Sequence, residues 1–456
     1  MSYGVDLSRV RDGLRLMWTG RVARLAARQR HPMYALGAIA ASLYVLGFWF
    51  HIPYGGGHVY SDLVTVFQNR LDATSFSINN LPYINTFIEY PPLTSWFIYL
   101  TGVLGAYLPL FPGSGIVYNY YAYSALFLSI PTLLMIQELM KICEILGIRR
   151  GSRRTLLFYV ATPSFIFIIL LNWYIIGVYF ATFGLRKYLQ GSRWASGLLF
   201  GISAGSNLVT AAPALGLLAT AEKWRERAVF AFAIIATYLL INLPFIVANR
   251  ALWLSFWSYE SNWYIEGSWM LAFLNNESPL RHYIFPAVLV VLTAAVLVGY
   301  SRQRKEAVTK REKAILSVKV SSLLTFAYLF STYVLTPQMN LMLLPFFVIA
   351  PLSRRYWEFV AFETVNALVI LWGFSAPLLA FGINLPAPVL FGPVWVSPIQ
   401  ALAVIRSLWI GKFLIYDGLI RPRIFPKLEE PVLVQTTLDI DWLSPRSRQL
   451  DDGPAH

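Results

Sequence analysis

Polar side chains that could do chemistry are few in this chain, and they occur in small groups between long apolar segments. Carboxylates lie at Asp62, Glu89 and Glu266. Amide, phenol, indole and cationic groups occur in similar places, at His58, Asn172, Tyr174, Asn207, Arg250, Trp269, Arg281 and Gln338. Polar groups at or near membrane depth are costly, which makes them candidates for binding or catalysis. For any one of them, an ordinary solvated loop residue is the alternative.

Glu266 has the most suggestive neighbours, because Trp263 and Trp269 flank it. A carboxylate between aromatic rings could bind a sugar, since aromatic faces stack on the C–H surfaces of sugars. An aromatic belt at a membrane interface explains the two tryptophans equally well. Glu89 precedes two prolines, so its alternatives are substrate binding and the capping of a turn.

Metal, disulfide and nucleotide-sugar chemistry find little support in the sequence. His51, His58 and His282 lack the spacing of metal ligands, so we expect no metal site and no cofactor. Cys143 is the only cysteine, so no disulfide can form within the chain. The run Asp439-Ile440-Asp441 imitates the Asp-x-Asp of nucleotide-sugar transferases. No Gly-rich strand–helix unit surrounds it, and coincidence is the better interpretation.

The apolar elements that must position these groups dominate the composition. Of 456 residues, 57% are apolar and only 13% are charged, whereas a soluble domain carries about a quarter charged residues. The excess apolar surface predicts helices that face lipid. The 15 tryptophans and 26 tyrosines fit rings placed at the two membrane interfaces. We therefore expect an all-α, multi-pass membrane protein.

Positive charge predicts how the apolar segments cross. Outside these segments nearly all Lys and Arg fall in clusters that can share the cytoplasmic side, with Arg70, Arg250 and Arg281 left for the opposite side. This requires segment 93–111 not to cross, and its prolines and glycines favour a juxtamembrane helix on the outer face. The prediction is about twelve crossings with both termini in the cytoplasm. The crossing segments lie near 33–50, 117–139, 155–170, 173–189, 194–206, 208–221, 228–248, 282–300, 316–334, 338–352, 357–381 and 396–416.

The predicted organisation is a basic interfacial segment at 1–32, a transmembrane domain at 33–416 and a polar cytoplasmic tail at 417–456. The candidate residues then gather on the outer side of the plasma membrane. They lie in the first outer loop at 51–116, at the hairpin tips, in the long outer loop at 249–281 and at a last tip near Gln338. Several polar tips around one aromatic loop favour a binding site there.

Several short motifs, in order, resemble those of a known superfamily. Tyr60-Ser61-Asp62-Leu63, Pro82-Tyr83 and Glu89-Tyr90-Pro91-Pro92-Leu93-Thr94 resemble the first-loop signature of the GT-C glycosyltransferases. The resemblance is to the polyprenyl-phosphate-mannose-dependent mannosyltransferases of glycosyltransferase family eighty-seven and their GPI-mannosyltransferase relatives. The other matches are Asn172-Trp173, Gly191 to Gly201 with Asn207-Leu208 and Pro213, Ile265-Glu266-Gly267-Ser268-Trp269, and Thr336-Pro337-Gln338 with Leu344-Pro345. The likeness covers roughly residues 33 to 352.

The resemblance implies a GT-C-like helical bundle that takes a sugar, expected to be mannose, from a polyprenyl phosphate. The first-loop aspartate of that family is the catalytic base, and it corresponds to Asp62. A carboxylate suits this role because an acceptor hydroxyl is a poor nucleophile until its proton is taken. A single displacement would invert the anomeric carbon. The expected partners are the lipid-linked donor, membrane lipids and an acceptor that is a glycolipid, a lipid-linked glycan or a protein, with no nucleic acid.

Two departures from the family's motifs bear on catalysis. The family's Asn-Trp-Asp reads Asn172-Trp173-Tyr174, and its hairpin lysine, a natural phosphate partner, is replaced by Asn207. Arg250, Arg281, His58 or His282 could supply the missing cation. The departures favour a rival hypothesis, in which the protein is a non-catalytic relative that binds lipid or glycan or serves as a partner subunit. A secondary transporter is a third hypothesis, weakened by the lack of an internal repeat and by the one-sided polar cluster.

Overall fold

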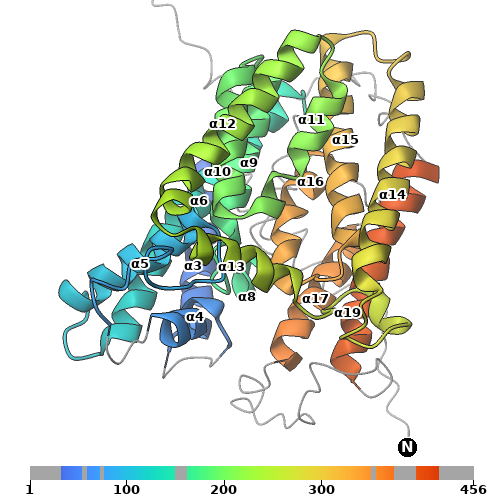
Figure 1. The fold of residues 1–456 in the computed structure, drawn as a ribbon. Helices are drawn as coiled ribbons and strands as arrows, with labels where there is room; N and C mark the ends of the chain where they lie inside the picture. The colour runs from blue at the N-terminus through green and yellow to red at the C-terminus, as the bar shows by residue number, and fades with distance from the viewer. Residues whose placement is uncertain are drawn as a thin grey trace, which may run out of the picture. The chain divides into compact units, whose positions relative to one another are not determined.

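The computed structural model describes residues 32–53, 59–71, 76–148, 162–350, 356–373 and 397–420 (Figure 1). The chain divides into two units, Met1–Pro422 and Arg423–His456, and every described residue belongs to the first. Regular structure among the described residues is helical, and β-pairing is limited there to two isolated bridges, Pro82 with Thr86 and Glu266 with Val334. The prediction of an all-α protein is confirmed for these residues.

Five helices among the described residues are long and apolar enough, by length and composition, to cross a membrane. They are α6 (Ile116–Ile145), α12 (Trp224–Ala248), α14 (Arg281–Gln303), α15 (Lys310–Ser331), and α19 (Pro398–Lys412) continued by the π-helix η6 (Phe413–Ile420). The membrane character of the chain is supported in this form, whereas twelve crossings remain a prediction. The two termini, at 1–31 and 421–456, lie outside the described residues.

Other segments predicted to cross as single helices are short or broken. Of segment 155–170, the described part contains only α8 (Pro163–Phe167). Segment 208–221 divides into η2 (Leu208–Ala211) and α11 (Pro213–Thr220), and segment 338–352 divides into η4 (Pro337–Met342) and α16 (Leu344–Ile349). Proline stands at the first or second position of α8, α11, η4 and α16, where its missing N–H costs nothing.

Small residues allow the green helices of Figure 1, α9 (Tyr174–Leu189), α10 (Arg193–Ser206) and α12, to pack closely. Gly197, Gly201 and Gly205 follow one another at four-residue spacing on α10. A Cβ atom at Gly201 would lie 2.5 Å from the Cβ of Thr237, and one at Gly197 would lie 2.5 Å from that of Ala233. Such a stripe of small residues is typical of membrane helices that pack backbone to backbone.

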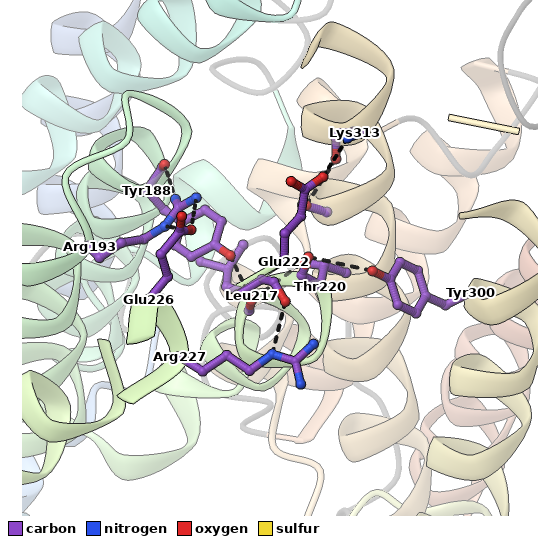
Figure 2. A network of polar contacts seen from close by, with 11 residues as sticks. Tyr188, Arg193, Leu217, Thr220, Glu222, Glu226, Arg227, Tyr300 and Lys313 are labelled. Atoms are coloured by element: carbon purple, nitrogen blue, oxygen red, sulfur yellow. Dashed lines mark hydrogen bonds and ion pairs between the residues drawn. The ribbon is translucent and has the colours of Figure 1, made fainter. Parts of the chain in front are cut away.

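A polar network includes residues from the C-terminal ends of α9 and α14 and from the N-terminal end of α15 (Figure 2). It includes bonds from Tyr188 Oη to Leu217 O (2.8 Å), Arg227 Nε to Ala221 O (2.9 Å) and Tyr300 Oη to Thr220 O (3.5 Å), and ion pairs of Arg193 with Glu226 (2.9 Å) and Lys313 with Glu222 (2.6 Å). The last carbonyls of a helix have no partner within it. The bonds to Leu217 O, Thr220 O and Ala221 O therefore cap the end of α11, while the ion pairs join α10 to α12 and α15 to the segment that follows α11.

Six further elements complete the described part of the fold. They are α3 (Pro32–His51), α4 (Asp62–Arg70), α5 (Pro92–Tyr107), α13 (Arg250–Ser261), η3 (Trp269–Ala272) and α17 (Tyr356–Gly373). Helix α5 begins at Pro92, directly after Pro91, as the double proline predicts. Its position relative to a membrane stays a prediction.

Candidate active site

A cavity of about 930 Å³ lies where α9 and α19 begin and α10 and α15 end. Sugar-sized and lipid-linked ligands are bound in cavities of this order. Among the residues predicted for a site, the structure brings Asp62, Glu89, Asn172, Tyr174, Asn207, Glu266 and Gln338 together in the wall of this one cavity. They come from six separate stretches of the chain, so only the fold collects them.

Asp62 is held in place by its own backbone and by the residue before it. It is the first residue of α4, where a carboxylate interacts favourably with the helix dipole. The Ser61 hydroxyl donates to Leu170 O at 2.8 Å, and the Asp62 amide donates to Leu171 O at 2.9 Å. The start of α4 is therefore fixed to the segment that carries Asn172.

The carboxylate of Asp62 is partly exposed to the cavity and is surrounded by neutral donors. Its Oδ2 atom accepts from Asn172 Nδ2 at 2.7 Å, from Gln338 Nε2 at 3.4 Å and from the Tyr90 hydroxyl at 3.5 Å. Tyr60 also hydrogen-bonds the carboxylate. Burial among protein atoms raises the pKa of Asp62, while the bonds from Asn172 and Tyr60 act in the opposite direction and Glu89 adds to the rise. Raised basicity together with fixed orientation suits a proton acceptor.

Glu266 lines the same cavity from a loop that is joined to the segment before η4. Its amide donates to Tyr333 O at 2.9 Å, and its carbonyl accepts from the Leu335 amide at 2.8 Å. Trp263 Nε1 donates to Glu266 Oε2 at 2.8 Å. Burial raises the pKa of Glu266, the bond from Trp263 lowers it, and Asp62 raises it further. The carboxylate and the Trp263 indole together present the kind of surface that binds sugar hydroxyls.

The mouth of the cavity carries a second polar group, made by Arg70, Glu89, Tyr259 and Glu260. Arg70 forms an ion pair with Glu89, and its guanidinium lies 5.7 Å from the centre of the Tyr259 ring. Glu260 has more than a third of its surface exposed. Protein atoms still crowd its carboxyl, and this desolvation, with Glu89 adding to it, raises the pKa of Glu260 to about 7.

Tyr174 and Asn207, the two departures from the family's motifs, are neighbours in the cavity wall. Their side chains are hydrogen-bonded to each other. Asn207 also accepts from the Val209 amide at 3.2 Å, which caps η2. Tyr174 is the first residue of α9, and Asn207 directly follows α10. Tyr174 and Asn207 thus form a neutral pair at the positions where the resembled motifs carry an aspartate and a lysine.

Other predicted site residues are not among those that line the cavity. Trp269 stacks on Phe330 and donates to its carbonyl at 2.7 Å. Arg250 is exposed at the start of α13. Arg281 is buried and donates to the carbonyls of Glu277 at 2.8 Å and Ser278 at 2.9 Å. Trp269 and Arg281 thus have local partners and Arg250 is exposed, the role of these residues in a site stays a prediction, and His58 lies outside the described residues.

The cavity also contains functional groups to which the sequence assigned no role. Tyr60 and Tyr90 contact Asp62, and Arg70 and Arg406 are the cations in the lining that the structure describes. Tyr90 stands inside the first-loop motif, so its position was a signal. Arg406 is a charge inside an apolar segment, which marks a functional candidate by itself. Among the described residues, no group of three or more His, Cys, Asp or Glu side chains could hold a metal ion.

Comparisons with known proteins give structural similarity at low sequence identity and no match at the level of sequence. No protein-family profile matches the chain, and no curated protein sequence is significantly similar to it. The crystal structure of the Archaeoglobus fulgidus oligosaccharyltransferase in its apo form aligns with 85% of this chain, at 12% identity and a TM-score of 0.40. The chain spans only 55% of the length of that protein. A TM-score of 0.40 does not establish a shared fold, so the function proposed below rests on the site's own residues.

Proposed function

We propose that this protein is a membrane glycosyltransferase of the GT-C type, which transfers a sugar from a polyprenyl-phosphate donor to an acceptor hydroxyl. The observation that carries the proposal is the Asp62 carboxylate, oriented by Asn172 and Gln338 in the wall of a cavity of about 930 Å³. The ordered motifs around Asp62, Glu266 and Gln338 lead to the same function, because the fold gathers all three in one wall.

In the proposed reaction Asp62 takes the proton of the acceptor hydroxyl as its oxygen attacks the anomeric carbon of the sugar. The new C–O bond forms while the bond from the anomeric carbon to the phosphate oxygen breaks. The electron pair of that bond leaves with the polyprenyl phosphate, which needs no proton but needs its charge stabilised. The anomeric configuration inverts in this single displacement.

Arg70 is the best candidate to contact the donor phosphate. Its side chain is 34% exposed and lines the cavity mouth, whereas Arg406 is completely buried. Glu89 would then orient the guanidinium for a bidentate contact with the phosphate. This assignment replaces Arg250 and Arg281, whose side chains bind elsewhere or face solvent.

The apolar part of the cavity suits the prenyl chain of the donor. Val369 and Ile370 of α17 and Ile399 and Ala403 of α19 line this part. A chain placed between these helices would leave the sugar at the Asp62 and Glu266 end. The transferred sugar would be mannose, as the motif resemblance implies. The acceptor would be a glycolipid, a lipid-linked glycan or a protein on the non-cytoplasmic face of the plasma membrane.

A non-catalytic role in binding lipid or glycan is the second candidate, and Tyr174 and Asn207 favour it. Their mutual hydrogen bond also fits a catalytic role. When an aspartate and a lysine are both replaced by neutral residues, no unpaired charge is left in the cavity wall. The two candidates make the same binding predictions. They differ only in whether the donor is consumed.

The test is sugar transfer in proteoliposomes supplied with radiolabelled polyprenyl-phosphate mannose and native membrane lipids. The wild type and Glu222→Gln, which alters an exposed pair at the opposite helix ends, should transfer label equally. Asp62→Asn should lose transfer while it still binds the donor. Donor binding by all three proteins with no transfer in any of several acceptor preparations would favour the binding role.

A further inference from the structure

Arg406 is a fully buried charge in the middle of α19, at 0% exposure. A buried guanidinium needs partners for its donors, and in the described part of the chain the two Nη atoms of Arg406 have partners whereas Nε has none. Nη1 donates to Asn366 Oδ1 at 2.8 Å, and Nη2 donates to Gly267 O at 3.3 Å and to Leu335 O. Two of these three acceptors are backbone carbonyls of the loops that line the candidate active site.

The first of these loops carries Glu266, which directly precedes Gly267. Gly267 has a φ of +63°, and a Cβ atom there would lie 2.3 Å from Leu335 O and 2.8 Å from Arg406 Nη2. Only glycine allows the two backbones and the guanidinium to approach so closely. The contact is therefore a specific feature of this loop, and it fixes the residue next to the Glu266 carboxylate.

The second loop leads into η4, which carries Gln338, and Arg406 reaches this segment by two routes. One is the direct bond to Leu335 O, and the other runs through Asn366, whose Nδ2 donates to Pro337 O at 3.1 Å. Pro337 directly precedes Gln338, the amide that donates to Asp62. One guanidinium thus holds the backbone beside Glu266 and the backbone beside Gln338.

We propose that Arg406 is a positioning residue that locks the Glu266 loop to the segment that leads into Gln338, so that both side chains line the cavity together with Asp62. It acts through backbone and Asn366 and does not touch substrate. The proposal of a role in transfer rests on the function proposed above, whereas the locking of the two loops does not.

Hydrogen–deuterium exchange of the full-length protein in nanodiscs measures the lock directly. The reporters are the amides of Glu266 and Leu335, which bond across the two loops. Arg406→Gln should raise exchange at both amides by about ten-fold or more, because the bonds lost involve a charged donor. Exchange in α10 and α12 should stay unchanged. Unchanged exchange at both reporters in a folded protein would overturn the proposal.

Three further variants separate the lock from charge and from general damage. Arg406→Lys keeps the charge but loses the forked set of donors. The amides of Glu266 and Leu335 should still exchange rapidly in this variant, and full protection of both amides would contradict the lock. Arg193→Gln removes a paired arginine at the opposite helix ends and should leave both reporters unchanged. If Arg406→Gln fails to fold, Asn366→Leu decides, because it should speed exchange around Leu335 more than at Glu266. Unchanged exchange around Leu335 would refute the link from Arg406 through Asn366 to Pro337 O.

The consequence for catalysis is measured separately. In the transfer assay Arg406→Lys should lower kcat by about ten-fold or more with little change in the KM for the donor, since the loops position groups for the reacting centre. A change in KM alone would overturn the role in transfer. If the wild type transfers no sugar, the proposed function fails, while the exchange result still decides whether the lock exists.

Discussion

Replacing Asn172 by leucine should create a defect that depends on pH. Asn172 Nδ2 lies 2.7 Å from Asp62 Oδ2, the shortest of the contacts to that oxygen given above. A hydrogen bond to a charged acceptor contributes about 1.5–3 kcal/mol, and about 1.4 kcal/mol corresponds to a factor of ten. Losing the bond destabilises the ionised form of Asp62, whose pKa is already raised by burial.

The sign of the effect follows from the role of a base. Asp62 accepts a proton only when it is ionised, so activity is lost as the pH falls through its pKa. A higher pKa in Asn172→Leu moves this loss to higher pH. On the acidic side the rate should fall by about ten- to a hundred-fold, and the defect should fade at a pH where Asp62 is ionised in both proteins.

The assay is the pH dependence of single-turnover transfer in proteoliposomes. Gln338→Leu should show a smaller defect, because its contact with Asp62 is longer, at 3.4 Å. Asn119→Leu removes a buried asparagine whose side-chain bonds, within the described part of the chain, go to residues 111–115, and it should leave the pH profile unchanged. A defect of Asn172→Leu that is the same at every pH would refute the reasoning.

Three other predictions concern packing, charge and the paired departures. Gly201→Val should lower stability by about 1–3 kcal/mol through overpacking, and a melting temperature in detergent equal to that of the wild type would contradict close α10–α12 packing. Glu260, whose pKa is raised to about 7, is neutral below that pH and anionic above it, so the KM for the anionic donor should rise between about pH 6 and 8. Glu260→Gln should abolish this rise, and a rise that persists would exclude Glu260 as its source. Tyr174→Asp and Asn207→Lys should each destabilise alone and compensate when combined, with a coupling of about 0.5–3 kcal/mol; strictly additive melting shifts would show that the pair is independent.

Much of the helical architecture follows from local sequence. The double proline before Leu93 predicts the start of α5 at Pro92, and the apolar run after Trp224 predicts α12. The composition predicts a membrane protein, and five described helices meet the length and composition required. The breaks within predicted spans are harder to foresee, because the apolar runs continue through η2 and η4. Proline positions were the available signal.

The site was predictable in part, through the order of its motifs. Asp62, Asn172, Glu266 and Gln338 were all named from the sequence, and the fold places them in one cavity wall. The hydrogen bonds between them join residues up to 276 positions apart, and no local pattern encodes such a separation. Arg406 illustrates the limit best, since its partners lie on a different helix and on two loops.

The charged residues in the outer loops were the least predictable. Sequence assigns Arg250 and Arg281 to one predicted loop, whereas the structure places them at the starts of α13 and α14, and sequence gives no direction to their side chains. Arg281 turns back to the carbonyls of Glu277 and Ser278, whereas Arg70, two turns along α4 from Asp62, lines the cavity. The direction of a side chain depends on packing between distant elements, and the spacing of residues along the sequence does not contain that information.

The most direct test of the central claim compares donor binding with single-turnover transfer for the wild type and Asp62→Asn. General-base catalysis contributes about a hundred-fold to ten-thousand-fold, so Asp62→Asn should bind polyprenyl-phosphate mannose as the wild type does and transfer at least about a hundred-fold more slowly. Transfer within a few-fold of the wild type by Asp62→Asn would contradict the assignment of Asp62 as the base.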